Sequence, residues 1–170
     1  MASKASKNQS AAQPPLPTFP NENVTSFTKV ALTNGWMGNM SPYPVEYRGE
    51  VYKTTEALFQ CLRVTDKTVA ELIRAEKSPM CAKMVAKKYR ASRVVEQGSE
   101  KDLKNMRLCL RLKVEQHPDL RVALLETGDS TIVEDTTKRN KVDIWGAKLK
   151  DGVWVGENVL GKLWMDLRKD

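Results

Sequence analysis

The apolar residues of this chain recur mainly at the spacing of helices. After residue 54 they stand three and four positions apart, which places them along one face of a helix. The clearest such face predicts a long helix and consists of Leu103, Met106, Leu110 and Val114. Another predicts a helix at the end of the chain and consists of Leu160, Leu163, Trp164 and Leu167.

Polar caps and prolines mark where the predicted helices begin. Serine, threonine and aspartate side chains accept the unpaired amides of a first turn, and proline fits that turn at little cost. The long helix follows Ser99, with Asp102 three residues later as in a capping box. The first of the remaining helices should run to about Val64, and the one before the last should stop at Gly128. Four helices are predicted after such signals, at Thr55, Asp66, Ser78-Pro79 and Pro118.

Short apolar segments between turn residues predict a few strands. Lys29–Leu32 and Thr131–Val133 have the composition of short strands, and Val45–Tyr52 has the pattern of a hairpin that turns at Arg48-Gly49. The segments around Trp145-Gly146 and Gly152–Gly156 are expected to be loops. We therefore expect the mainly α fold class, a single compact helical domain with short β-hairpins.

The first 26 residues differ in composition from the rest. They are rich in proline, serine, alanine, asparagine and glutamine, and they contain too little apolar surface to offset the entropy of ordering. We predict a disordered tail over residues 1–26 and one folded domain over residues 27–170. The tail lacks the apolar segment of a secretory signal, which indicates an intracellular protein, cytoplasmic or nuclear.

The overall composition is that of a soluble globular protein with excess positive charge. Hydrophobic residues make up 41% and charged residues 29%, and no apolar run has the length of a membrane span. The net charge is +7, and Lys4, Lys7 and Glu22 contribute only +1 of it from the predicted tail. Such an excess attracts phosphate-bearing ligands, but it does not distinguish a nucleotide from a nucleic acid.

The cysteines and the single histidine do not predict a metal site. Cys61, Cys81 and Cys109 stand 20 and 28 residues apart, which matches no zinc-ligand spacing, so we expect buried free thiols. His117 lies at a predicted helix boundary without a second histidine, and we expect a structural role for it.

Several common catalytic motifs are absent, and the remaining candidates are acids. The chain has no glycine-rich phosphate loop before Lys-Ser or Lys-Thr, no paired histidines and no serine flanked by glycines in an elbow motif. Glu56 lies just inside a predicted helix start, where an acid can also simply complement the helix dipole. Glu134, Asp135 and Asp143 flank a Lys-Arg-Asn-Lys turn, where ordinary loop acids are also found.

Several segments together resemble one enzyme family. The stretch TTEALFQCLR from Thr54 resembles a family segment in which threonine and glutamate open a helix, and SPMCAKMVAKK from Ser78 resembles the family's Ser-Pro-Met-x-Ala helix. The ending is the most specific part, with DIWG from Asp143, GENVLGKL from Gly156 and MDLR from Met165. Near the start, Phe-x-Lys from Phe27 and Gly-x-x-Gly-Asn from Gly35 are similar to further family signatures. The chain from Phe27 to Arg168 thus resembles the NADAR (YbiA-like) family of N-glycosidases.

This resemblance implies hydrolysis of the bond between ribose C1 and a nitrogen base, without a cofactor or a metal. We favour ADP-ribose attached to guanine, free or in nucleic acid, as the substrate, because the chain is basic and carries no fused deaminase or reductase domain. The alternative substrates are aminopyrimidine ribophosphate intermediates of riboflavin synthesis. No membrane partner is expected.

The implied reaction assigns roles to particular residues. A cationic transition state at C1 calls for nearby negative charge, a base that directs water and an acid that protonates the departing nitrogen. We expect Glu56 and Asp143 to supply these roles, and Lys29 either to attack an opened ribose C1 or to hold a phosphate. The expected ligand contacts, led by a base-stacking tryptophan, are Asn39, Arg48, Glu134, Trp145, Gly146, Asn158 and Gly161, with Lys53 as a further phosphate contact.

Two departures and two rival hypotheses accompany this assignment. Many relatives have histidine at the position of Ala57 and lysine at that of Arg63, which indicates a divergent branch. A non-catalytic nucleic-acid or ADP-ribose binding module is the main rival, with a basic surface formed by Lys83, Lys87, Lys88 and Arg90. A protein-interaction scaffold that has lost turnover is the other.

Overall fold

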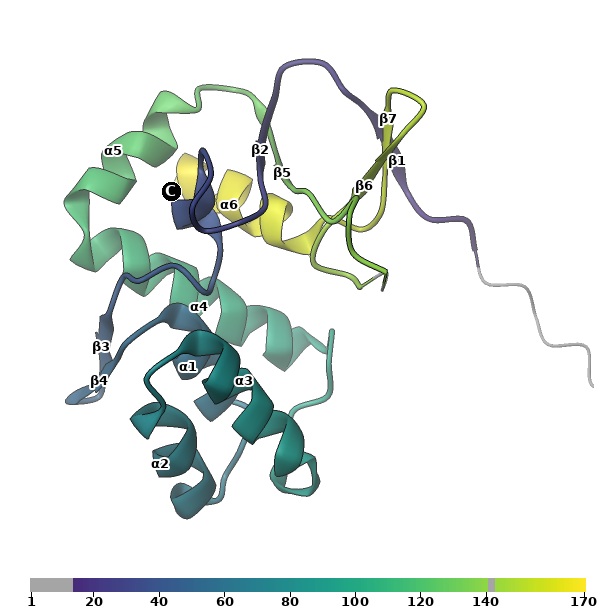
Figure 1. The fold of residues 1–170 in the computed structure, drawn as a ribbon. Helices are drawn as coiled ribbons and strands as arrows, with labels where there is room; N and C mark the ends of the chain where they lie inside the picture. Colours follow the sequence, from purple (N-terminus) through teal and green to yellow (C-terminus); the bar gives the residue numbers. More distant parts are fainter. Residues whose placement is uncertain (1–13, 141–142) are drawn as a thin grey trace, which may run out of the picture.

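A long central helix separates the two halves of the fold (Figure 1). The structure is a computed structural model that describes residues 14–140 and 143–170. On one side of α4 (Glu100–Gln116) lie α1 (Thr55–Cys61), α2 (Lys67–Ala75) and α3 (Pro79–Lys88), which pack on one another. On the other side lie most of the strands, together with α5 (Pro118–Glu126) and α6 (Val159–Lys169). The predicted fold class, mainly α with small β elements, is confirmed.

Most predicted helix starts are confirmed at the level of the capping side chain. Asp66 accepts from the amides of the first turn of α2, and Ser78 and Ser99 do the same for α3 and α4. The first helix is an exception, because its cap is Thr54 and not the predicted Thr55. Thr55 instead donates its hydroxyl to Asn39. The helix also ends earlier than the predicted Val64, at Cys61.

Part of the predicted tail is ordered, because its backbone pairs with strands from the end of the chain. β1 (Thr18–Pro20) pairs antiparallel with β7 (Val153–Val155), and β2 (Val24–Phe27) pairs parallel with β5 (Thr131–Glu134). The prediction of disorder is therefore wrong for both of these segments. Residues 1–13, which belong to the same prediction, lie outside the described residues.

Two hairpins turn at residues with left-handed backbones. In β3 (Val45–Tyr47) and β4 (Glu50–Tyr52), the turn residues Arg48 and Gly49 have φ of 53° and 80°, which confirms the predicted hairpin. A second hairpin joins β6 (Lys148–Lys150) to β7 through Asp151 and Gly152, at φ 48° and 79°. The loop predicted at Gly152–Gly156 is therefore wrong for Val153–Val155, which form β7.

The strand predicted at Lys29–Leu32 is wrong, whereas the one at Thr131–Val133 is confirmed. Residues 29–32 form an exposed turn, and Leu32 donates its amide to the Lys29 carbonyl oxygen. The strand lies just before it, at β2, because Phe27 and not Leu32 is buried: their exposed fractions are 2% and 55%. A strand needs a partner as well as apolar residues, and β5 supplies it.

The main core lies between α4, α5, α6 and α1. Trp164 of α6 is fully buried and donates its indole N–H to the Met37 carbonyl oxygen. The predicted apolar face of the last helix is thus buried at Trp164, and Trp154 of β7 is buried as well. None of the helices in the described ranges has the length and apolar character needed to cross a bilayer.

The cysteine prediction is correct for two thiols and wrong for one. All three cysteines are free, and Cys61 and Cys109 are buried. Cys81 is exposed, because it lies on the outer side of α3, whereas the neighbouring Ala82 faces the core. His117, between α4 and α5, hydrogen-bonds through Nε2 to the Pro44 carbonyl oxygen at 2.7 Å, in keeping with a structural role.

Candidate active site

Glu56 is a buried acid in the first turn of α1. Its residue is only 5% exposed, and its carboxylate Oε1 accepts a hydrogen bond from Gln60 Nε2 at 2.8 Å. One helical turn separates these two residues, so the amide holds the carboxylate along the helix face. The backbone of Glu56 is fixed as well, because its amide donates to the Asn39 carbonyl oxygen at 3.0 Å.

Asn39 supports the start of α1. Its carbonyl and side-chain oxygens both accept from the Thr55 hydroxyl at 3.1 Å, and its side-chain amide lies 3.1 Å from the Met106 sulfur. Asn39 is buried. Its visible role is to position Glu56, and its predicted contact with a ligand stays a prediction.

Glu134 is a second buried acid, at the end of β5. Arg139 donates to its Oε1 at 2.9 Å, whereas its Oε2 is buried and has no hydrogen-bond partner among the described residues. Burial raises the pKa of the Glu134 carboxyl; the Arg139 guanidinium opposes this rise, and the charge of Asp143 adds to it. Oε2 is therefore the oxygen of this carboxyl that is left to carry a proton or to meet a ligand or water.

Lys83 interacts electrostatically with both acids. It projects from α3, and its Nζ lies 4.0 Å from Glu56 Oε1. The same ammonium also lowers the pKa of Glu134, as a smaller effect than those of Arg139 and Asp143. Glu56 from α1, Lys83 from α3 and Glu134 from β5 therefore form one electrostatic cluster, although they are far apart in the sequence.

Asn158 and two glycines hold β5 in place beneath Glu134. The Asn158 side chain accepts from the Glu134 amide at 3.1 Å and donates to the Ile132 carbonyl oxygen at 2.8 Å. A Cβ on Gly161 would lie 2.1 Å from the Ile132 oxygen, and one on Gly146 would lie 2.5 Å from the Glu134 oxygen. Close packing therefore explains both glycines, and the predicted ligand contacts of all three residues stay predictions.

Trp145 contacts α1 through the ring of Phe59. The two rings meet edge to face with centroids 5.6 Å apart, and Trp145 is only partly buried. Its backbone amide donates to Asp143 Oδ1 at 3.0 Å, so Asp143 shapes the turn that presents the indole. Beneath Phe59 lies the Arg63 guanidinium, 3.9 Å from the ring centroid, which is fixed by two 2.7 Å hydrogen bonds to Asp102. Stacking of Trp145 on a base stays a prediction.

The other predicted residues lie at different places relative to Glu56, Lys83 and Glu134. Lys29 is exposed two residues after Phe27, which is the strand partner of Glu134. Asp135 accepts from the Thr137 amide in a turn next to Glu134. Arg48 lies exposed at the tip of the β3–β4 hairpin, on the side of the molecule opposite to β6 and β7 (Figure 1).

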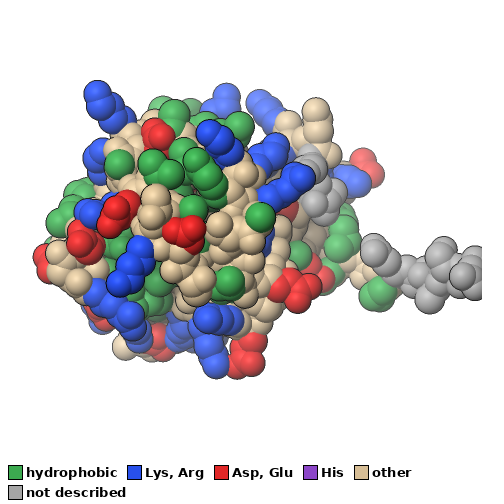
Figure 2. All heavy atoms as spheres, turned by 90° about the horizontal axis from the view of Figure 1, so that it is seen from below, with side chains coloured by type: hydrophobic (Ala, Val, Ile, Leu, Met, Phe, Trp, Pro, Cys, Tyr) green, Lys and Arg blue, Asp and Glu red, His purple; other side chains and the backbone are tan. Residues whose placement is uncertain are grey.

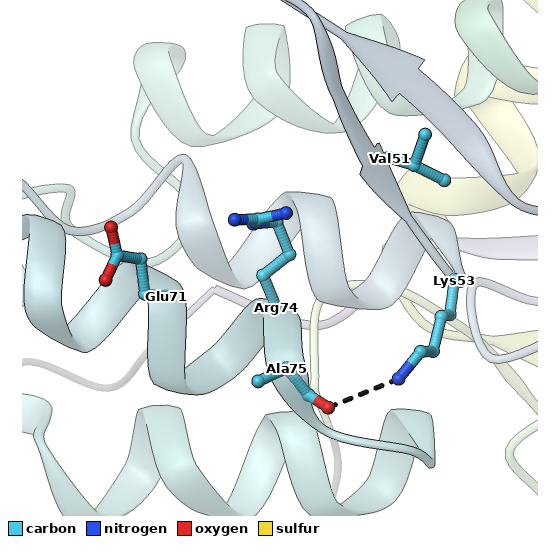
Figure 3. Close-up of a pocket in the computed structure, with 5 residues that line it drawn as sticks. All are labelled: Val51, Lys53, Glu71, Arg74 and Ala75. Atoms are coloured by element: carbon cyan, nitrogen blue, oxygen red, sulfur yellow. Dashed lines mark hydrogen bonds between the residues drawn. The ribbon is translucent and has the colours of Figure 1, made fainter.

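Lys53 lies in a separate surface hollow and not in the cluster (Figure 3). Its ammonium donates to the carbonyl oxygens of Ala75 and Glu76 at 3.2 and 3.1 Å, which satisfies the end of α2. Beside it, Arg74 pairs with Glu50 at 2.6 Å. A structural role therefore accounts for Lys53.

Three residues near the two acids, Lys83, Gln60 and Arg139, are not among the predicted site residues. Gln60 follows Glu56 by one helical turn, and Arg139 lies in the turn after Glu134, so both had a local signal. Lys83 was placed in a possible nucleic-acid surface. Its approach to Glu56 depends on how α3 packs against α1, which no local pattern reveals.

Comparison with known proteins places this arrangement in a family. Residues 22–170 match the model of the NADAR domain. The N-glycosidase YbiA of Escherichia coli is 30% identical over 148 residues, which cover 87% of this chain and 88% of that protein, and YbiA of Shigella sonnei is 31% identical over the same length. An N-glycosidase of Acanthamoeba polyphaga mimivirus is 40% identical over 68 residues, or 35% of this chain and 38% of that protein.

A solved structure agrees with the sequence matches. The NMR structure of Escherichia coli YbiA superimposes with a TM-score of 0.73 at 32% identity, and the alignment covers 86% of this chain and 83% of that one. The domain match begins at Glu22, before the predicted boundary at residue 27, and so includes β2. The chain therefore belongs to the NADAR-domain family of YbiA-like N-glycosidases.

Proposed function

We propose that this protein hydrolyses the bond between ribose C1 and the nitrogen of a base, with Glu56 and Glu134 as the acid–base pair. The observation that carries the proposal is that two buried carboxyl groups both lie within the electrostatic influence of Lys83, and that Glu134 Oε2 has no hydrogen-bond partner among the described residues. The curated relatives that carry the name N-glycosidase support this reaction class.

The two acids differ in their surroundings, and this suggests different roles. The raised pKa of Glu134 favours a protonated carboxyl that can donate its proton to the departing nitrogen. Glu56, next to the Gln60 amide and the Lys83 ammonium, is placed as the carboxylate that stabilises positive charge at C1 and takes a proton from water. In this step the C1–N bond breaks, a C1–O bond forms, and one proton passes from Glu134 to the base.

The remaining predicted residues complete the proposed site. Trp145 would stack on the base, which is worth about 1 to 3 kcal/mol in aromatic recognition of bases. Asp143 would act by orienting Trp145 and by raising the pKa of Glu134. Lys29 is the candidate for a phosphate or an opened ribose, because it follows the strand that pairs with β5.

For the substrate we propose ADP-ribose attached to guanine. The observation that favours it is the concentration of positive charge next to Lys83: residues 77–95 contain six lysines and arginines and no acid. A pyrophosphate-bearing ligand would be attracted to such a segment. A single ribose phosphate on an aminopyrimidine has less charge to gain from it.

The test is release of base from both candidate substrates. The protein is incubated with a guanine-ADP-ribosylated oligonucleotide and, separately, with the aminopyrimidine ribophosphate of riboflavin synthesis, and the products are identified by mass spectrometry. The Glu56→Gln and Glu134→Gln variants should each lose about a hundredfold or more in kcat. The control is Glu115→Gln, which alters an exposed acid of α4 paired with Arg111.

Each outcome has a definite meaning. Release from the oligonucleotide alone, lost in both variants, supports the proposal. Release from the pyrimidine alone would move the substrate to riboflavin intermediates. If turnover persists in the Glu134→Gln variant, the assignment of that residue as the acid is wrong.

A further inference from the structure

Positive charge is strongly segregated along this chain. Residues 77–95 carry Lys77, Lys83, Lys87, Lys88, Arg90 and Arg93 without an acid, which is +6 of a total of +7. The rest of the protein is therefore close to neutral. Charge spread evenly serves solubility, whereas charge gathered in one segment indicates a binding surface for an anion.

Three of these cations, Lys83, Lys87 and Lys88, lie exposed on α3, and the first of them lies next to Glu56. Lys83 and Lys87 are one helical turn apart, about 6 Å along the axis, and Arg90 follows in the 3-10 turn Arg90–Ser92. Lys83 already lies 4.0 Å from Glu56. The basic row therefore leads away from the active site over the protein surface.

The groups beyond Lys83 are free to bind a ligand. Among the described residues, Lys87, Lys88 and Arg90 form no salt bridge, and together with Met84 they line an open hollow of about 350 Å³. Lys88 also lies over the Tyr89 ring, 5.3 Å from its centroid. Seen from below relative to Figure 1, the molecule exposes many Lys and Arg side chains, with apolar side chains between them (Figure 2).

Two methionines add an apolar component to the same face. Met80 and Met84 are 55% and 54% exposed, one turn apart on α3. Methionine is flexible and polarisable, so it adapts to flat or irregular apolar groups such as the rings of bases. A row of cations beside apolar side chains matches a nucleic-acid strand, which presents phosphates beside unstacked bases.

We propose that the exposed face of α3 with Arg90 binds the strand of a single-stranded nucleic acid next to the modified guanine. This inference rests on the proposed function and assigns the polymer, rather than a free nucleotide, as the preferred substrate. A single strand is required because Glu56 and Glu134 are buried, 5% and 8% exposed. A base within a duplex would have to leave its stack to reach them.

The first test is direct binding of an unmodified strand. Fluorescence anisotropy follows a labelled oligodeoxynucleotide of roughly 15 nucleotides, near the upper end of common site sizes, over a series of NaCl concentrations. The triple variant Lys87→Ala, Lys88→Ala, Arg90→Ala should bind more weakly. Its log–log salt slope should be shallower by about 2, which is three lost phosphate contacts at roughly 0.7 each.

A matched variant controls for net charge. Arg121→Ala, Lys150→Ala, Lys169→Ala removes the same charge from exposed positions on α5, β6 and α6. It should retain the wild-type salt slope, and circular dichroism should show both triple variants folded. An equal loss of binding in the two variants would overturn the proposal, because it would reduce the effect to net charge.

The second test separates this inference from the proposed function. The ratio of kcat/KM for a guanine-ADP-ribosylated oligonucleotide to that for ADP-ribosylated guanosine monophosphate should fall on the order of tenfold in the Lys87, Lys88, Arg90 variant. An unchanged ratio, with turnover of both substrates, would overturn the surface and leave the activity standing. No turnover of either substrate would refute the proposed function, and the binding test would still decide on the surface.

A competition experiment excludes a different kind of partner. Unlabelled oligonucleotide should displace the labelled strand, whereas polyglutamate with the same number of charges should not. Equal displacement by polyglutamate would assign the face to acidic proteins and overturn the nucleic-acid proposal.

Discussion

Removal of Asp102 should destabilise the protein, because its partner Arg63 would remain buried without a counter-charge. Asp102 is fully buried and forms two 2.7 Å hydrogen bonds with the guanidinium of Arg63, whose side chain is 9% exposed. Breaking a buried pair in this way costs about 3 to 5 kcal/mol, because the remaining charge stays buried without compensation. In the Asp102→Ala variant that charge would also lie near Arg93, whose pKa is already lowered by burial and by Arg63.

The expected loss is large enough to measure by heating. For a chain of this size, 1 kcal/mol corresponds to roughly 2 to 4 °C in Tm, so Asp102→Ala should lower the Tm by about 6 to 20 °C. Thermal unfolding followed by circular dichroism gives this value directly. Asp129→Ala is the control, since Asp129 is exposed and pairs only with Asn23 in the described structure.

A double variant tests whether the uncompensated charge is the cause. Replacing both partners, as Arg63→Met with Asp102→Leu, removes both charges and should restore most of the lost stability. One cost remains, because Asp102 also accepts from the Gly98 amide at 2.9 Å, which is worth about 1 kcal/mol. If the double variant is less stable than either single variant, the reasoning is refuted, because packing and not charge would then dominate.

Three further predictions concern titration and reactivity. The raised pKa of Glu134 means that the folded protein releases this proton at a higher pH than the unfolded chain, whose pKa is 4.5. The free energy of unfolding should therefore decrease as the pH rises from 4.5 through the folded-state pKa, and Glu134→Gln should remove this contribution in urea titrations. Burial lowers the pKa of Lys113 to about 7 from 10.5, so stability should increase with pH between these values, and an equal increase in Lys113→Met would contradict this assignment. Cys81 alone should react with a thiol reagent in the native protein, whereas all three thiols should react after unfolding; a second fast thiol in the native state would show that the core opens.

Features decided by adjacent residues could be predicted from the sequence. The caps at Asp66, Ser78 and Ser99 are examples, because a cap depends on one side chain and the three amides that follow it. The Arg48-Gly49 turn is another, since glycine readily adopts the positive φ angle that such a turn requires, here 80° at Gly49. The same local rule placed the first cap one residue late, because it could not show that Thr55 is engaged by Asn39.

Features that depend on distant pairing could not be predicted. β2 pairs with β5 across most of the chain, so its order depends on a partner and not on its own composition. The candidate site shows the same division. Glu56 and Glu134 could be named as acids near element boundaries, but their link through Lys83 arises only from the packing of α3 on α1.

The hydrogen bonds between the Asn158 side chain and β5 have a consequence for folding during protein synthesis. Synthesis proceeds from the N-terminus, and domains fold as their residues leave the ribosome. The helices α1 to α4 are complete at residue 116, but the Glu134 amide is paired by an asparagine 24 residues later than Glu134, and the Glu134 carbonyl oxygen by the amide of Ala147. A chain that stops before Asn158 would therefore lack part of the support of Glu134, and under the proposed function it should not hydrolyse the glycosidic bond.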